Sequence, residues 1–455
     1  MPLRSQNPYT KEIYADFEPL GDVDIYHAIE EAAIAFNTRK NTSRETKKTL
    51  THRLADLLER DIDMHATNQT QEMGMIFSVS KKGLHSTVAL IRRFADNAEN
   101  ILKPQPFSTT DGLVGEYQYD PLGVIYGIAP RNFPYNQLLR AAIPNILAGN
   151  TQIYKHASNV PRCALAIQKL FDDAGFPHGV YTNLFISGSQ SELIIAHPCV
   201  AGVNVTGGET VGSIIGAMAG KYLKPSVLEL GGNDAFIVLD THNLDAVVAA
   251  AVSCRLANGG QKCNSSKRFI VPAPLYESFC EKMSILLAQQ KVGDPFDLTT
   301  NLGPLATTEI LHTVHKQVLK TCEQGARCLT GGRILDEAKN LYAPTLLADI
   351  KPGMVAFEEE IFGPVASVIK AHDIEDAIHL ANTSPYGLSA VVYGDDIDQC
   401  KAVARRLEGG MIFINQPAGS KASLPFGGVK KSGYGKENGP EGLRAFTNKK
   451  VILFP

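Results

Sequence analysis

A glutamate and a cysteine, each next to a glycine turn, are the residues of this sequence whose types could do covalent chemistry. Glu229 is the one carboxylate in a short apolar run before a Gly-Gly pair, and Cys263 lies in a loop of Gly, Gln, Lys, Asn and Ser. A free thiol has a pKa of about 8.5, its thiolate attacks carbonyl carbons, and a nearby carboxylate can act as a base toward the thiol or toward a water. Residues 235–239 are predicted as a strand and 244–256 as a helix, so one strand-helix excursion can return the chain beside Glu229.

Most cysteines of globular proteins are buried and inert. The polar neighbours of Cys263 instead favour a reactive thiol. Residues 228–232 (Leu-Glu-Leu-Gly-Gly) and 260–263 (Gly-Gln-Lys-Cys) resemble the two active-site signatures of the aldehyde dehydrogenase superfamily. The resemblance covers nearly the whole chain, and residues 155–160 and 426–433 are similar to the bacterial succinate semialdehyde dehydrogenase branch.

Bulk composition narrows the function classes. The chain has 455 residues, enough for two or three domains, with 44% hydrophobic and 20% charged residues. Its net charge of −3 without a basic stripe disfavours nucleic acid as a partner, and no apolar run approaches the roughly 18 residues of a membrane helix. The N-terminus lacks the apolar core of a signal peptide, and eight cysteines without CxxC spacing disfavour a metal site or a disulfide framework. We therefore expect a cytoplasmic enzyme.

The pattern of elements predicts an α/β fold. Residues 23–100 have helical periodicity, and from residue 121 strands alternate with helices, which favours a parallel sheet covered on both faces. The predicted strands of this sheet are residues 124–128, 151–154, 182–186, 201–205 and 226–230.

The resemblance implies three domains. These are a Rossmann-like dinucleotide-binding domain (residues 1–102 and 122–230), an α/β catalytic domain (231–430) and a small β arm (103–121 and 431–455). In the superfamily such an arm pairs with another subunit, so a homodimer or homotetramer is expected.

A glycine turn is the predicted phosphate site. Gly207 and Gly208 follow a predicted strand and precede a helix, and such a turn presents free backbone N–H groups to phosphate. The superfamily usually has a serine where this chain has Gly208. Lys155 matches a lysine that contacts the adenine ribose, and Ser158 replaces a glutamate that binds both ribose hydroxyls. Loss of that carboxylate removes a repulsion toward a 2′-phosphate, so NAD and NADP both stay open as cofactors.

Further cofactor contacts are implied by the resemblance. Glu360 would hold the nicotinamide ribose, and Phe362 would pack near the ring. Gly212 and Leu230 complete the expected cofactor-binding set.

The resemblance also assigns an oxyanion donor. Residues 130–134 (Pro-Arg-Asn-Phe-Pro) resemble a Pro-Trp-Asn-Phe-Pro segment whose asparagine, here Asn132, would act together with the backbone N–H of Cys263. Removing one such donor typically costs about 10²–10³ in rate. Arg131 replaces the tryptophan and makes the surroundings of the nicotinamide more polar.

Arg140 carries the substrate prediction. Asn132, Asn136 and Arg140 are spaced four apart, which places them on one face of a helix. Enzymes acting on succinate semialdehyde have an arginine at the position of Arg140, and a guanidinium suits a carboxylate because two parallel hydrogen bonds form. An exposed or salt-bridged arginine is the alternative. A second arginine of the better-known enzymes is Ala257 here, so Lys262, Arg131 or the loop 419–421 would supply the second contact.

The sequence thus predicts NAD(P)-dependent oxidation of a small semialdehyde, with succinate semialdehyde to succinate as the best candidate. Cys263 would form a thiohemiacetal and then a thioester, and Glu229 would activate the water that releases the acid. The alternatives are oxidation of another small polar aldehyde, or a non-redox thiol esterase using the same two residues.

Overall fold

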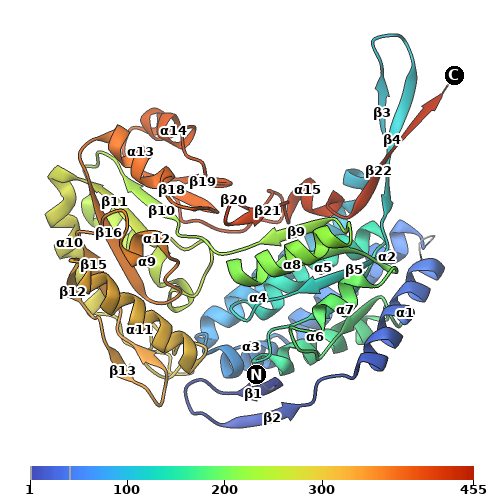
Figure 1. Ribbon diagram of the computed structural model, residues 1–455, viewed down its shortest axis with the longest axis horizontal. Helices are drawn as coiled ribbons and strands as arrows, with labels where there is room; N and C mark the ends of the chain where they lie inside the picture. Colours follow the sequence, from blue (N-terminus) through green and yellow to red (C-terminus); the bar gives the residue numbers. More distant parts are fainter. Residues whose placement is uncertain (1–2, 40–41, 455) are drawn as a thin grey trace.

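A computed structural model describes residues 3–39 and 42–454 of the chain. Two large sheets, each packed with helices, lie side by side, and a narrow three-stranded sheet projects from one of them (Figure 1). Both large sheets are mainly parallel, which confirms the predicted α/β class.

The first large sheet has six strands in the order β21-β9-β8-β5-β6-β7, and all but β21 are parallel. Its strands are β5 (Val124–Ile128), β6 (Thr151–Lys155), β7 (Tyr181–Asn183), β8 (Val200–Thr206), β9 (Ser226–Glu229) and β21 (Gly433–Tyr434). Ile153 and Tyr154 are successive residues of β6 and belong to different hydrophobic cores, as expected when both faces are covered. The five predicted strands are confirmed, although β7 is shorter than residues 182–186.

Eight helices of the N-terminal half pack around this sheet in the part of the chain that the structure describes. They are α1 (Asp22–Arg39), α2 (Arg44–Arg60), α3 (Ile62–Met73), α4 (Phe77–Leu102), α5 (Pro134–Ala148), α6 (Pro161–Ala174), α7 (Ser191–Ala196) and α8 (Glu209–Lys221). Before them β1 (Leu3–Gln6) pairs with β2 (Ile13–Phe17), a hairpin that the sequence did not indicate. No described helix is long and apolar enough to cross a membrane.

The second large sheet has seven strands in the order β12-β15-β16-β11-β10-β18-β19, with β12 antiparallel. Its strands are β10 (Ala235–Val238), β11 (Arg268–Pro272), β12 (Arg327–Thr330), β15 (Thr345–Ala348), β16 (Val365–Ala371), β18 (Ser389–Tyr393) and β19 (Met411–Ile414). The accompanying helices are α9 (Leu244–Leu256), η1 (Ala257–Gly260), α10 (Ala273–Ala288), α11 (Thr308–Glu323), α12 (Val355–Glu358), α13 (Ile374–Asn382) and α14 (Ile397–Ala404). Ile237 and Phe236 of β10 likewise enter separate cores.

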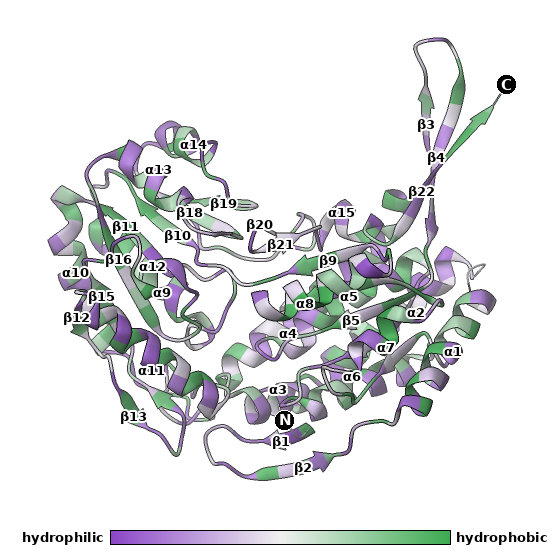
Figure 2. Cartoon of the chain, viewed as in Figure 1, coloured by the Kyte–Doolittle hydropathy of each residue, from purple (hydrophilic) through white to green (hydrophobic). Residues whose placement is uncertain are grey.

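The projecting sheet joins two distant parts of the chain. It consists of β3 (Gln105–Ser108), β4 (Val114–Pro121) and β22 (Thr447–Phe454), in the antiparallel order β22-β4-β3. Figure 2 shows hydrophobic residues toward the outer end of β22, where Leu453 and Phe454 are exposed.

Short strands and one short helix complete the described elements. They are β13 (Ile334–Asp336), β14 (Leu341–Tyr342), β17 (Tyr386–Gly387), β20 (Val429–Lys430) and α15 (Gly439–Arg444). β21 lies in the segment that the sequence analysis assigned to the arm, yet it pairs with β9 of the six-stranded sheet. The domain boundaries themselves stay predictions.

Candidate active site

The turn after β9 and the loop before β11 are hydrogen-bonded to each other, which brings the predicted acid and thiol together. The backbone N–H groups of Lys267 and Arg268 donate to the carbonyl oxygen of Asp234 over 2.9 and 3.1 Å. Glu229 ends β9 before this turn, and Cys263 lies in the loop between η1 and β11. Both residues line one cavity.

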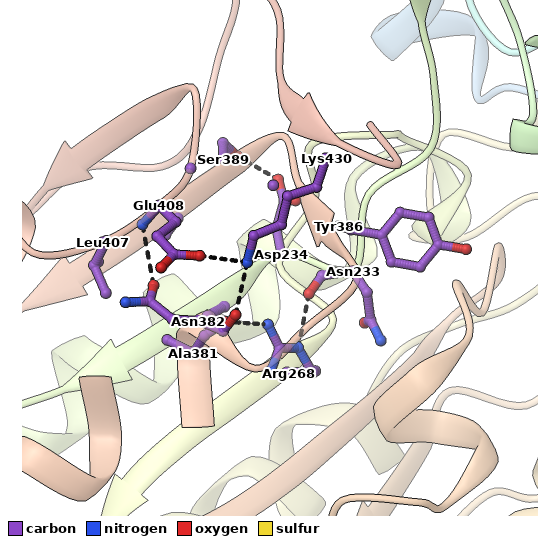
Figure 3. Close-up of a pocket in the computed structure, with 14 residues that line it drawn as sticks. Asn233, Asp234, Arg268, Ala381, Asn382, Tyr386, Ser389, Leu407, Glu408 and Lys430 are labelled. Atoms are coloured by element: carbon purple, nitrogen blue, oxygen red, sulfur yellow. Dashed lines mark hydrogen bonds and ion pairs between the residues drawn. The ribbon is translucent and has the colours of Figure 1, made fainter. Parts of the chain in front are cut away.

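A small polar cavity beneath this junction is filled by its own hydrogen bonds (Figure 3). Arg268 Nε donates to the Asn233 carbonyl oxygen over 2.8 Å, and Ser389 Oγ donates to Asp234. Lys430 Nζ lies 2.5 Å from a carboxylate oxygen of Glu408. These hydrogen bonds stabilise the junction. The cavity has a volume of only about 20 Å³, which leaves no room for a substrate.

Two larger cavities meet at Cys263. The first, here called the glycine-turn cavity, has a volume of about 480 Å³. The second, the arginine cavity, has about 180 Å³. Cys263 and Gln137 belong to the walls of both, so a ligand in either cavity can approach the thiol. The glycine-turn cavity is defined by Gly207, Gly208, Glu229, Cys263, Glu360 and Phe362, and the arginine cavity by Asn136, Gln137, Arg140, Lys262, Cys263 and Phe426.

Glu229 is a buried carboxyl group. It is 2% exposed, and neither of its side-chain oxygens has a hydrogen-bond partner among the described residues. Burial raises the pKa of Glu229 well above its usual range, and the nearby Glu437 carboxylate raises it further, whereas Arg140 and Lys436 lower it. A raised pKa makes the ionised carboxylate a stronger base toward water, which suits a general base.

The backbone of Cys263 is fixed by a hydrogen bond from Lys267. Its carbonyl oxygen accepts a hydrogen bond from Lys267 Nζ, which also forms a 3.0 Å ion pair with Glu360. Burial raises the pKa of the Cys263 thiol to about 11, while the positive charges of Arg140 and Lys267 lower it.

Asn132 lies outside the helix on which the sequence analysis placed it. α5 begins at Pro134 with Phe133 as its N-cap residue, so the helical face shared with Asn136 and Arg140 is wrong for Asn132. A proline at the first helical position favours a helix that starts there. Asn132 nevertheless lines the glycine-turn cavity, and its side-chain amide donates to the Gln261 carbonyl oxygen over 3.0 Å.

Four of the residues predicted to bind the cofactor line the glycine-turn cavity: Gly207, Leu230, Glu360 and Phe362. Gly212 lies behind it in α8, where a Cβ atom would come within 2.3 Å of the Leu230 side chain. This glycine therefore lets Leu230 pack against α8.

Lys155 and Ser158 are placed apart from the residues that line this cavity. Lys155 Nζ makes a 3.4 Å hydrogen bond to the His156 carbonyl oxygen, and the Ser158 carbonyl oxygen accepts from the backbone N–H of Arg4. Ala157, between them, does line the cavity. Both side chains are therefore close in sequence to its wall without belonging to it.

The glycine-turn cavity fits a nicotinamide dinucleotide. Gly207 and Gly208 precede α8, and a Cβ atom on Gly208 would meet nothing within 4 Å, so the turn borders open space. Backbone N–H groups at such a turn can bind phosphate. Cys263, in the wall of the same cavity, offers a reacting atom.

The residues predicted to bind substrate line the arginine cavity. Asn136 Nδ2 donates to Thr87 Oγ1 over 2.9 Å, and Lys262 Nζ donates to the Ala418 carbonyl oxygen over 2.9 Å. Both groups are thus fixed by the protein, and Ser420, from the predicted polar loop, completes this wall.

Arg140 is both salt-bridged and part of the cavity wall. Its Nε lies 2.6 Å from Glu437 Oε2, both side chains are 3% exposed, and its guanidinium lies 4.2 Å from the centre of the Phe426 ring. Its Nη2 has no hydrogen-bond partner among the described residues. The salt-bridged alternative therefore holds for Nε, and Nη2 remains able to donate to a carboxylate.

Three residues that line or support the two cavities were not indicated by the sequence analysis: Gln137, Arg255 and Glu437. Arg255 is fully buried and donates to the carbonyl oxygens of Gly260 and Ile361 and to Ser265 Oγ, which ties the Cys263 loop to the segment after Glu360. An arginine ending an otherwise apolar helix was a signal for such a role. No group of residues that could hold a metal ion occurs in residues 3–39 and 42–454.

Comparison with known proteins places this site in a family. Residues 2–452 match the model of the aldehyde dehydrogenase family. A Deinococcus radiodurans protein named succinate-semialdehyde dehydrogenase [NADP(+)] is 39% identical over 455 residues, covering 100% of this chain and 95% of that protein. A Mycobacterium tuberculosis protein named succinate-semialdehyde dehydrogenase [NADP(+)] 1 is 40% identical, with 99% of each chain covered.

Solved structures agree with the sequence relatives. The succinic semialdehyde dehydrogenase of Streptococcus pyogenes, in complex with NADP+, matches with a TM-score of 0.97 at 37% identity, and 99% of each chain is covered. The sequence match and the shared fold lead to one conclusion: the chain belongs to the aldehyde dehydrogenase family.

Proposed function

We propose that the protein oxidises succinate semialdehyde to succinate with NADP+ as the hydride acceptor. The observation that carries this proposal is Nη2 of Arg140, a buried donor without a partner among the described residues, in a cavity that also contains Cys263. A semialdehyde whose carboxylate binds Nη2 would present its aldehyde carbon to the thiol. The relatives named NADP-dependent succinate-semialdehyde dehydrogenases support the same substrate and cofactor.

The chemistry begins at Cys263. Its thiolate attacks the aldehyde carbon to form a thiohemiacetal, and the Asn132 amide and the Cys263 backbone N–H donate to the oxyanion. Glu360 and Phe362 would hold the nicotinamide, which would supply an acceptor for the hydride lost from the thiohemiacetal carbon. A thioester on Cys263 results.

Glu229 completes the cycle. Its carboxylate takes a proton from a water, which then attacks the thioester and releases the acid. A buried base without fixed partners among the described residues is free to bind that water. Burial raises the pKa of Glu229, which means that its carboxylate binds a proton more tightly.

The test is an assay of the purified protein with succinate semialdehyde, butanal and other small polar aldehydes against both NAD+ and NADP+. Stoichiometric NADPH formation, with the highest kcat/KM for succinate semialdehyde, is the expected result. A higher kcat/KM for another aldehyde would reject the substrate. Ester hydrolysis without NADPH formation would identify a thiol esterase instead.

We further propose that the arm formed by β3, β4 and β22 binds another copy of the chain, giving a homodimer or homotetramer. Val451 is 55% and Leu453 54% exposed on β22, whose second edge is unpaired among the described strands. A molar mass from light scattering equal to one chain would contradict this.

Eight free cysteines suit a reducing compartment, which supports a cytoplasmic location.

A further inference from the structure

Arg131 is a partly buried cation without a partner in the part of the chain that the structure describes. It lies in the loop between β5 and α5 and lines the glycine-turn cavity. Among the described residues it forms no hydrogen bond and no ion pair, and Glu309 of α11 is the charged neighbour that acts on its guanidinium. Such a group is costly to desolvate unless something binds it.

The charges around the cavity make Arg131 distinctive. Of the described residues that line it, Glu229, Glu309 and Glu360 are acidic and Arg131 is the basic one. Burial raises the pKa of Glu229, which favours its neutral form, and Glu360 is paired with Lys267. A dinucleotide brings a doubly charged pyrophosphate into this cavity, and Arg131 is the lining side chain that can neutralise it.

The position of Arg131 favours the pyrophosphate as its ligand, rather than the 2′-phosphate of NADP+. It directly precedes Asn132, whose amide is bound 3.0 Å from the loop that carries Cys263. The phosphates nearest to the nicotinamide are those of the pyrophosphate, whereas the 2′-phosphate is on the adenine ribose. The glycine turn borders the same cavity, and Gly208 has no side-chain hydroxyl to donate.

We propose that Arg131 binds the cofactor pyrophosphate and supplies the side-chain contact that Gly208 lacks. This inference rests on the proposed use of a nicotinamide dinucleotide. A guanidinium can donate two parallel N–H groups to phosphate oxygens, which a neutral side chain of similar size cannot do. Glu309 competes for the guanidinium and repels the phosphates.

The test is isothermal titration of NADP+ and of NAD+ into the full-length protein without aldehyde. Arg131→Gln is expected to weaken both by the same factor, on the order of 10- to 100-fold, because a charge-assisted hydrogen bond is lost. Arg131→Lys should lose less because the charge remains. Glu309→Gln should tighten binding of both cofactors. The control is Lys169→Gln, which changes the net charge equally at an exposed site paired with Asp173.

Salt dependence provides a second readout, since the affinity of the wild-type protein should fall more steeply with salt than that of Arg131→Gln. Equal affinities of the two proteins would overturn the inference. A loss confined to NADP+ would also overturn it, because it would assign Arg131 to the 2′-phosphate.

If the wild-type protein binds cofactor through Arg131 but oxidises no aldehyde, the proposed function fails and the inference stands. If it oxidises aldehydes while Arg131→Gln binds normally, the inference alone fails.

Discussion

Replacing Arg140 by methionine removes both of its contacts, the ion pair with Glu437 and the proposed bond to the substrate. Methionine keeps much of the buried volume and removes the charge. Glu437 would then lie 3% exposed without its ionic partner, although Asn204 Nδ2 and Thr206 Oγ1 still donate to its Oε1. Breaking a buried ion pair from one side costs about 3–5 kcal/mol in the free energy of unfolding. The double variant Arg140→Met/Glu437→Gln should recover part of this loss because no buried charge is left unpaired.

The effect on catalysis is expected to depend on the substrate. A charge-assisted hydrogen bond from Nη2 to the substrate carboxylate contributes about 1.5–3 kcal/mol, so its loss lowers kcat/KM for succinate semialdehyde by a factor of roughly 10–150. Loss of the positive charge also raises the pKa of Cys263, but that change affects every aldehyde equally. The ratio of kcat/KM for succinate semialdehyde to that for butanal therefore isolates the carboxylate contact.

The measurement is this ratio for the wild-type protein, Arg140→Met, Arg140→Lys and the double variant, with the melting temperature of each as the control for folding. The ratio should fall in both methionine variants and fall less in Arg140→Lys. A ratio that stays constant while both individual rates drop would mean that Arg140 acts through Glu437 and the Cys263 pKa alone. The proposed contact with the substrate carboxylate would then be refuted.

Three further predictions concern the thiol and the base. Cys263→Ala should abolish NADPH formation while the affinity for NADP+, measured by titration, stays unchanged; remaining dehydrogenase activity would remove Cys263 from its role. Glu229→Gln should still form the thioester but hydrolyse it slowly, so stopped-flow traces should show a burst of NADPH and then slow turnover, and an unaltered steady state would rule Glu229 out as the base. Because burial raises the pKa of Cys263 to about 11, its thiolate fraction should increase about tenfold per pH unit below that value. The rate of alkylation by iodoacetamide should therefore rise from about pH 7 to about pH 10, and a plateau near neutral pH would contradict this.

Local patterns were sufficient to predict the scaffold of the site. Strand β5 has the predicted bounds, helix α9 spans the predicted residues 244–256, and the five strands of the first sheet follow the alternation of strands and helices in the sequence. Such elements depend on hydrophobic periodicity and turn residues within a short window, which the sequence shows directly. The order of the motifs along the chain then indicated Glu229 and Cys263. The glycine turns beside these two residues are also local features that the sequence shows directly.

The sequence by itself determined the order of the elements, the thiol and the acid predicted to react, and the positively charged side chain at residue 140. Only the tertiary structure decided what those groups contact. Glu437 is 297 positions from Arg140 in the chain, and Gln137 joins both cavities through the position of α5 in the fold. Burial at these contacts sets the pKa of Glu229, and burial depends on how distant segments pack, which no short stretch of sequence encodes.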